Sequence, residues 1–260
     1  MEKFDAVLNT NHIIDWLKQE FADYGSETKA VIGMSGGKDS TIACAFLVQA
    51  LGADRVIGVI MPDGYMVDEG LAQAICESFG IKYSIIPIDG ITSKFYEVYS
   101  NCFDNEINST ILTNTPARIR MSMLYAVAAS CHGRVVNTCN QSETEIGWFT
   151  KWGDGVGDFS ILENYTVNEV IEMGLELYER GVIADSHWIT KIPDDGMCGQ
   201  SDEEKFGFSY ETLDNYLTYG IVPDINTMTK IRAMINNSRH KKNVCIDSPA
   251  KITKEGEVWF

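Results

Sequence analysis

Residues 30–40 read Ala-Val-Ile-Gly-Met-Ser-Gly-Gly-Lys-Asp-Ser, and no other segment says as much about the fold. A short β-branched run leads through a glycine pair into an apolar segment with helical spacing. Glycines let the backbone adopt positive φ and approach a phosphate closely, and a helix N-terminus offers free N–H groups. The order strand, glycine-rich turn, helix therefore predicts a phosphate-binding loop. A tight turn that binds nothing is the simpler alternative.

Similar apolar runs follow along the chain. Residues 55–61 and 83–88 recur at regular intervals after the first run, and residues 134–138 follow after a longer gap. Each run is rich in Val and Ile and is bounded by Gly, Pro, Asp or Asn, as buried parallel strands tend to be. The segments 40–51 and 67–79 between them show helical spacing and end at glycines. This alternation predicts an α/β fold with a doubly wound, mostly parallel sheet flanked by helices.

The remaining segments are expected to complete one domain over residues 1–260. Residues 1–29 form an amphipathic N-terminal helix, residues 30–145 the βαβ nucleotide-binding core, and residues 146–260 substrate loops and C-terminal helices. Residues 116–131 are almost wholly apolar, which predicts a helix buried on most sides and a candidate for subunit packing. Residues 147–158 and 191–207 are rich in Gly, Asp and Ser, which predicts two long loops over a site. Short helices are expected at 210–219 and 227–237.

Composition narrows the class of partner. The formal net charge is −16, which argues against nucleic acid as the main partner because phosphate backbones are bound by basic surfaces. The longest apolar run is far short of a membrane span, and residues 1–10 lack a signal-peptide pattern. The seven cysteines are scattered without a C-x-x-C pair, which favours reduced thiols over a zinc site or a disulfide framework. These features predict a cytoplasmic protein that binds no membrane.

The glycine-rich loop is not a Walker loop. The spacing from Gly33 to Gly37 is one residue too short, and Asp39 stands where Ser or Thr is required. The run S-G-G-x-D-S resembles the loop of the ATP pyrophosphatases, which cut ATP between its α and β phosphates. That resemblance implies an adenine nucleotide alpha hydrolase-like, Rossmann-like fold. The carboxylate of Asp39 suits magnesium.

Three later segments and one C-terminal residue pair resemble the NAD synthetase family in particular. Residues 117–125 resemble its A-R-x-R-M-x-x-L-Y helix, and residues 137–158 its G-T-x-x-x-x-E and G-[FYW]-F-T-K-[YW]-G-D-G segments. Residues 202–210 resemble its D-E-x-x-[LF]-G-x-[ST]-Y run, and His240-Lys241 its C-terminal H-K pair. Order and spacing agree from about Gly33 to Lys241, which is most of the chain.

The resemblance implies an ammonia-dependent NAD synthetase. Such an enzyme uses ATP to adenylate the carboxylate of deamido-NAD, and ammonia then displaces AMP. The implied magnesium ligands are Asp39 and Glu143, and Asp154 is a candidate for positioning or deprotonating ammonia. A homodimer is implied as well. The implied ATP-binding residues are Gly33, Met34, Ser35, Gly36, Gly37, Lys38, Asp39, Ser40 and Thr138, and those for deamido-NAD are Arg118, Lys151, Asp158, His240 and Lys241.

Each of these residues also has a plainer interpretation. Arg118 could form a structural ion pair, because an unpaired charge in an apolar helix is costly. Lys151 and Asp154 could be solvated loop charges, and His240 could belong to a basic tail. Trp148 and Trp152 could stack on a nicotinate ring or simply pack the loop.

Two positions depart from the family pattern. Many members carry a lysine where this chain has about Val167, and P-[ST]-A-D-L where it has residues 193–197, including Asp194. Both changes bear on the ATP contacts. An alternative interpretation therefore remains, in which the protein has the same fold and binds a nucleotide as a non-catalytic sensor.

A second alternative is another ATP pyrophosphatase, such as a tRNA-thiolating enzyme. It would need paired catalytic cysteines and a basic surface, and the sequence offers neither. Residues 1–29 are also too few for a glutamine-hydrolysing domain. Free ammonia is therefore expected as the nitrogen source.

Overall fold

The centre of the molecule is a sheet of five parallel strands. The computed structural model describes residues 4–64, 68–103, 106–190 and 201–242, and the backbone of residues 251–252 and 258–259. The strand order is β3-β2-β1-β4-β5. The bounds are β1 (Lys29–Gly33), β2 (Val56–Ile60), β3 (Lys82–Ile85), β4 (Gly133–Asn137) and β5 (Phe159–Ser160). The predicted parallel α/β fold is confirmed, and β5 is an addition too short for the sequence pattern to indicate.

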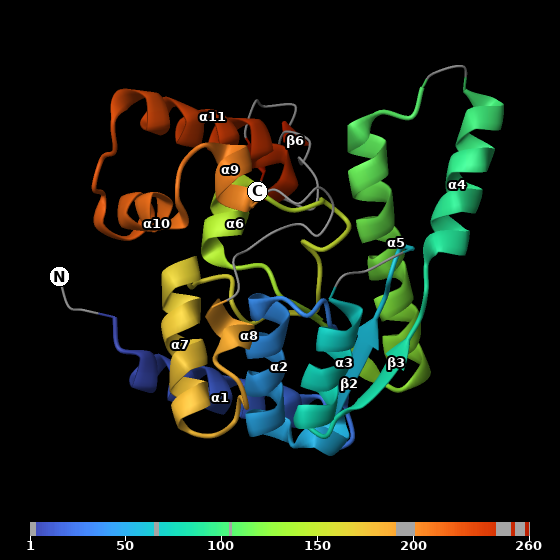
Figure 1. Cartoon of the computed structure of the whole chain (residues 1–260), viewed down its shortest axis with the longest axis vertical. Coiled ribbons are helices and arrows are strands. Elements are labelled where there is room, and N and C mark those ends of the chain that lie inside the picture. Colours follow the sequence, from blue (N-terminus) through green and yellow to red (C-terminus); the bar gives the residue numbers. More distant parts are fainter. Residues whose placement is uncertain are drawn as a thin grey trace.

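Helices connect and cover these strands (Figure 1). The first six are α1 (Ala6–Asp23), α2 (Lys38–Leu51), α3 (Glu69–Ser78), α4 (Asp89–Cys102), α5 (Ser109–Ser130) and α6 (Gln141–Ile146). The others are α7 (Val167–Glu179), α8 (His187–Thr190), α9 (Asp202–Phe206), α10 (Tyr210–Tyr219) and α11 (Ile225–Lys242), with a 3-10 turn at Ala53–Arg55. The backbone at β6 (Lys251–Ile252) and β7 (Val258–Trp259) pairs as a small antiparallel ribbon.

The central strand packs on both faces. Ala30 and Ile32 belong to the main hydrophobic core, which includes residues of α1, α2, α3 and α7. Val31 points to the opposite face and joins a second core with Ala128 of α5. Alternate residues of a strand point to opposite faces, so a strand apolar throughout is buried between two layers of helices. This is the doubly wound arrangement that the sequence predicts.

A separate helical lobe contains the two predicted C-terminal helices, α10 and α11, and one helix, α9, where a loop was expected. Helices α6, α9, α10 and α11 surround a third apolar cluster that includes Ile146, Phe206 and Leu213. The prediction of a loop over residues 191–207 is wrong for its last part, since α9 is a helix; residues 191–200, with Asp194, lie outside the described residues. Ser201 accepts a hydrogen bond from the Glu204 N–H while the Glu204 side chain accepts from the Ser201 N–H. This reciprocal cap starts the helix despite the polar composition.

Helix α5 differs from its prediction in length and burial. It begins at Ser109, and within this chain only Thr115, Pro116 and Ala128 are buried, so the expectation of a helix buried on most sides is wrong. Pro116 lies inside the helix and cannot donate to the carbonyl four residues before it. That carbonyl, of Leu112, instead accepts a hydrogen bond from the Tyr96 hydroxyl of α4 at 3.3 Å. The contact joins α4 and α5 into a hairpin beside the sheet (Figure 1).

Two sequence-based expectations on composition can be compared with the structure. The cysteines of the described residues, Cys44, Cys76, Cys102, Cys131 and Cys139, are all free thiols, whereas Cys198 and Cys245 lie outside them. Within the same residues, no helix combines the length and the apolarity that crossing a bilayer demands.

Candidate active site

The site lies where the sheet reverses its winding. Strands β1 and β4 are neighbours, and the chain continues from them toward opposite edges of the sheet. In open α/β sheets the ligand crevice lies outside the carboxyl ends of the strands at this point. The phosphate-loop candidates follow β1, and Thr138 and Glu143 follow β4. The structure thus brings together two segments separated by most of the nucleotide-binding core.

The loop after β1 leaves the start of α2 open to an anion. Gly37 is the N-cap of α2, and in the part of the chain that the structure describes no side chain caps this end. The first N–H groups of a helix have no partner within it and attract negative charge. Gly36 has a φ of +80°, and a Cβ there would lie 2.9 Å from the Cβ of Asp68. A side chain at this position would therefore force the loop out of its observed shape.

Two hydroxyls fix the shape of the same loop. The Gly37 N–H donates to the Ser35 hydroxyl at 3.1 Å, and the Ser40 hydroxyl lies 3.1 Å from the Ser35 hydroxyl. The Ser40 hydroxyl also donates to the Gly37 carbonyl. Ser35 is exposed, so its hydroxyl remains within reach of a ligand. Gly33 ends β1, and Met34 directly after it positions the loop, because the Met34 N–H donates to the Val59 carbonyl of β2.

Lys38 and Asp39 form a close ion pair in the first turn of α2. The Lys38 Nζ lies 2.6 Å from the Asp39 Oδ2, and the lysine side chain is 3% exposed. Burial alone would lower the pKa of Lys38, but the negative charges of Asp39 and Glu143 outweigh it and raise that pKa. Lys38 is therefore a buried cation held by carboxylates.

Asn140 connects Asp39 and Glu143, the two carboxylates that are predicted to bind magnesium. Its Nδ2 donates to the Asp39 Oδ1 at 3.3 Å, and its backbone N–H donates to the Glu143 Oε2 at 3.1 Å. Its Oδ1 accepts from the Glu143 N–H, which completes a capping box at the start of α6. Asn140 is fully buried. The structure thus confirms that Asp39 and Glu143 lie together, around a residue that the sequence analysis did not assign.

The environment of Glu143 disfavours the ionised form of its carboxyl group. Burial and the neighbouring charge of Asp39 raise the pKa of Glu143 from 4.5 to about 8. A cation that replaces the proton would relieve this cost. Within the described residues, no three or more His, Cys, Asp and Glu side chains converge as a metal cluster. Two carboxylates fit magnesium nonetheless, since this ion commonly takes one or two of them together with substrate phosphates and water.

Asp154 belongs to the predicted loop over residues 147–158. Its Oδ1 accepts from the Thr150 N–H at 3.0 Å. The surrounding protein raises the pKa of the Asp154 carboxyl through desolvation, although the Thr150 hydrogen bonds oppose this. Burial, and after it the negative charges of Asp154 and Glu143, raise the pKa of the Cys139 thiol, which follows Thr138. Asp154 therefore lies near the carboxylates of Asp39 and Glu143.

The cationic residues assigned to deamido-NAD form a second group on this loop. The Lys241 Nζ donates to the Gly147 carbonyl at 2.8 Å and to the Phe149 carbonyl at 2.7 Å. The Lys151 Nζ donates to the His240 carbonyl at 2.6 Å, and the Arg118 Nε donates to the Lys151 carbonyl at 3.2 Å. These bonds fasten α5 and α11 to the loop. The His240 ring is exposed.

Asp158 and Trp148 have partners within the protein. The Asp158 Oδ2 accepts from the Val135 N–H of β4 at 2.7 Å, which anchors the end of the loop to the sheet. The Trp148 ring meets Phe206 edge-on at 4.7 Å, so it packs the helical lobe. Val167 is also buried in that lobe, and its N–H donates to the Ser142 hydroxyl. No cation is available from this position.

The capping pattern is the signal that could have identified Asn140. Asn followed three residues later by Glu is the sequence signature of a helix N-terminus. Tyr210 is a second residue near the site that the sequence analysis quoted without a role. Its hydroxyl donates to the Asp202 Oδ2 at 3.2 Å, and burial and the charge of Glu143 raise its pKa. Helix α9 is thereby tied to the site.

Comparison with known proteins gives the family. The model of the NAD synthase family matches residues 9–245. The NH(3)-dependent NAD(+) synthetase of Pyrococcus furiosus is 33% identical over 241 residues, which cover 87% of this chain and 90% of that protein. The enzyme of the same name from Thermococcus kodakarensis is 38% identical over 206 residues, 79% of this chain and 77% of that protein.

Solved structures agree with this. The NMN synthetase of Francisella tularensis has a TM-score of 0.85 and 28% identity, and the match covers 95% of this chain and 99% of that one. The NH3-dependent NAD synthetase of Campylobacter jejuni, in complex with nitrate, has a TM-score of 0.74 at 22% identity, covering 95% and 100%. On the sequence match over nearly its whole length, together with the shared fold, this chain belongs to the NAD synthase family.

Proposed function

We propose that the chain is an ammonia-dependent ligase that converts deamido-NAD to NAD and cleaves ATP to AMP and pyrophosphate. The observation that carries this proposal is the meeting of the uncapped α2 N-terminus with Asp39 and Glu143 around Asn140. An open helix N-terminus binds phosphate, and the paired carboxylates suit the metal that accompanies ATP. Use of ATP also fits the cytoplasmic location that the sequence predicts.

The first step joins substrate and nucleotide. A carboxylate oxygen of deamido-NAD attacks the α-phosphorus of ATP, the bond from that phosphorus to the bridging oxygen breaks, and pyrophosphate leaves. The N–H groups at the start of α2 hold the phosphates in line, while Asn140 keeps Asp39 and Glu143 aimed at the same place. Bound magnesium supplies charge that stabilises the leaving pyrophosphate.

The second step forms the amide. Ammonia attacks the carbonyl carbon of the adenylate, AMP leaves, and one proton is lost from nitrogen. Asp154 is suited to accept that proton, because desolvation raises its pKa toward the working range of a general base. Its hydrogen bond from the Thr150 N–H fixes the direction of the carboxylate.

The cationic loop group is proposed to bind the phosphates of deamido-NAD. Arg118 is exposed and bonds the loop at the carbonyl of Lys151, which belongs to this loop, and Lys241 bonds the same loop from α11. Because Lys241 already bonds two carbonyls, we assign it chiefly to holding the loop in shape. Arg118 and Lys151 then face the ligand, with His240 and Asp158 at the borders of the loop.

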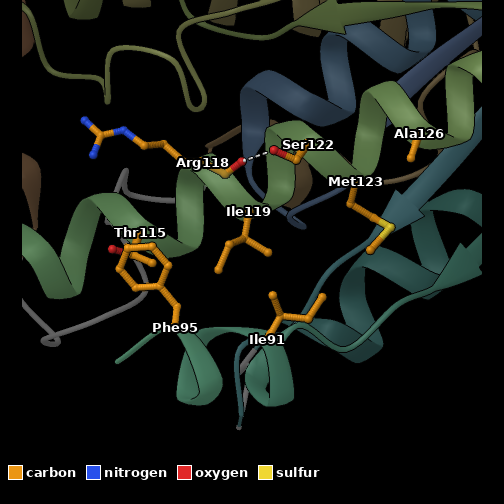
Figure 2. Close-up of a pocket in the computed structure, with 8 residues that line it drawn as sticks. All are labelled: Ile91, Phe95, Thr115, Arg118, Ile119, Ser122, Met123 and Ala126. Carbon is orange, nitrogen blue, oxygen red and sulfur yellow. Dashed lines mark hydrogen bonds between the residues drawn. The ribbon is translucent and has the colours of Figure 1, made fainter. Parts of the chain in front are cut away.

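The α4–α5 hairpin is proposed to form an isologous dimer interface. Ile91 and Phe95 of α4 face Ile119 and Met123 of α5 across an apolar groove of about 440 Å³ (Figure 2). The hairpin exposes a row of large apolar side chains, namely Ile91, Phe95, Val98, Phe103 and Leu112. Large apolar side chains that gather on an exposed surface often mark an association site. Arg118 stands at the groove rim, which would place the substrate beside the partner.

A second candidate substrate is nicotinate mononucleotide, which carries the same carboxylate without the adenylate half. It is favoured by the higher TM-score and identity to the protein named NMN synthetase. The chemistry at Asp39, Glu143 and Asp154 would be unchanged. Only the contacts to the far half of the substrate would differ.

The two candidates predict opposite preferences. We expect kcat/KM to be higher for deamido-NAD than for nicotinate mononucleotide, because the exposed Arg118 and the half-buried Lys151 can engage a second phosphate. Initial rates with each substrate, at saturating ATP and ammonium, measure the ratio. A higher kcat/KM for the mononucleotide would favour the second candidate.

A further inference from the structure

Lys38 is an unusual residue for its position. It is the first residue of α2, where the positive end of the helix dipole disfavours a cation. It is also buried, and lysines are almost never fully buried unless they are paired. Both effects oppose an ammonium group here, and the carboxylates of Asp39 and Glu143 offset them. A side chain kept in place at such cost has a use for its charge.

The contacts of Asp39 show what that charge does. Its Oδ2 is bonded to the Lys38 Nζ at 2.6 Å, and its Oδ1 accepts from Asn140 at 3.3 Å. A metal ion that binds Asp39 comes close to the Lys38 ammonium, and the repulsion between the two cations favours the departure of Lys38 from this carboxylate. Asn140 is locked by its reciprocal bonds with Glu143, whereas Lys38 has a flexible stem and a single ionic contact to this carboxylate. Lys38 is the partner that can move.

We propose that Lys38 is a counter-cation that neutralises Asp39 and Glu143 in the free enzyme and is displaced by magnesium onto the phosphates of ATP. This rests on the proposed function, in which ATP and magnesium share the site. With both carboxylates ionised, the three side chains leave one negative charge uncompensated. A divalent ion turns this into one positive charge, which suits a polyphosphate.

A fixed structural ion pair would behave differently. If Lys38 acted only by filling space and holding the shape of the site, and not through its charge, removing it would weaken the binding of every ligand. A displaced counter-cation competes with magnesium but assists ATP, so its removal must move the two affinities in opposite directions. That divergence is the signature to measure.

The test compares Lys38→Met and Lys38→Arg with the unmodified enzyme and with Lys18→Met, a control at a lysine of α1 whose side chain is 53% exposed. The first probe is magnesium alone, titrated against the thermal unfolding midpoint at mildly alkaline pH. The second is magnesium with an ATP analogue that has an uncleavable methylene between the α and β phosphates, followed by calorimetry. If Lys38→Met does not fold, Lys38→Gln replaces it.

In Lys38→Met we expect half-maximal stabilisation at about tenfold less magnesium, and about tenfold weaker binding of the analogue, each equal to one pKa unit of interaction. Lys38→Arg and Lys18→Met should match the unmodified enzyme toward magnesium. An unchanged or higher magnesium requirement in Lys38→Met, or undiminished analogue binding, would overturn the proposal. If that happens while the unmodified enzyme still releases pyrophosphate, the proposed reaction stands without this role for Lys38.

Discussion

Asp39→Asn and Glu143→Gln should each reduce NAD formation by about a thousandfold or more while leaving the fold intact. Loss of one anionic metal ligand removes several kcal/mol of stabilisation from the leaving pyrophosphate, and each 1.4 kcal/mol is about tenfold in rate. Both changes are nearly isosteric and keep the Asn140 contacts largely possible. Steady-state rates with circular dichroism as the fold control measure the effect. A near-normal rate in either variant would remove that residue from the site.

Glu143→Gln should also raise the thermal stability of the protein at mildly alkaline pH, because it removes a buried carboxylate that lies beside Asp39. Burial and Asp39 raise the pKa of Glu143 from 4.5 to about 8, so the native state holds this proton more tightly than the unfolded state. Between those values the free energy of unfolding falls as pH rises. Without magnesium, the variant should therefore unfold at a higher temperature than the unmodified protein when the pH is about 8. The difference in unfolding temperature should vanish below pH 4.5, where Glu143 is protonated in both states. A difference that does not depend on pH would contradict this explanation.

Charge on the α4–α5 hairpin should separate the proposed dimer. Phe95 is 47% exposed in the single chain and lines the groove of Figure 2. Burying such a side chain is worth about 1.5–3 kcal/mol. An isologous interface contains it twice, so Phe95→Asp should weaken association at least a hundredfold, on the scale of about tenfold for each 1.4 kcal/mol. The affinity for deamido-NAD should fall with it, because Arg118 stands at the same groove.

Ile225→Asp is the matched control for this experiment. Ile225 is 74% exposed and is the first residue of α11, which belongs to the helical lobe and not to the hairpin. Its substitution should leave both association and activity unchanged. Sedimentation velocity at micromolar concentration, combined with rate measurements, reports both properties. A fully active monomer of the unmodified chain would refute the dimer.

The parts of the fold that local sequence predicts are those with local causes. Strand β1, the glycine loop and α2 are contiguous, and their apolar spacing and glycines act within a few residues. The apolar stretch over α5 was misjudged for the opposite reason. Its pattern is that of a buried helix, but the described residues of this chain leave most of it uncovered. Apolar composition indicates that a helix face is to be covered, but it does not indicate which surface covers it.

The site shows the same division. Asp39 and Glu143 were found from their motifs, whereas the contacts through Asn140 depend on two strands being neighbours. Lys241 was assigned to the ligand, yet its Nζ bonds two loop carbonyls, a tertiary contact that no spacing reveals. Helix α9 was missed because Gly, Asp and Ser suggested a loop, although its reciprocal cap is visible in the sequence at Ser201 and Glu204.

The most direct test of the central claim is the product balance of the purified protein with ATP, magnesium, deamido-NAD and ammonium. Chromatography of the nucleotides together with a pyrophosphate assay measures it. The open α2 terminus and the paired carboxylates predict one AMP and one pyrophosphate for each NAD formed. ADP and orthophosphate as the only products, or ATP binding without release of pyrophosphate, would contradict it.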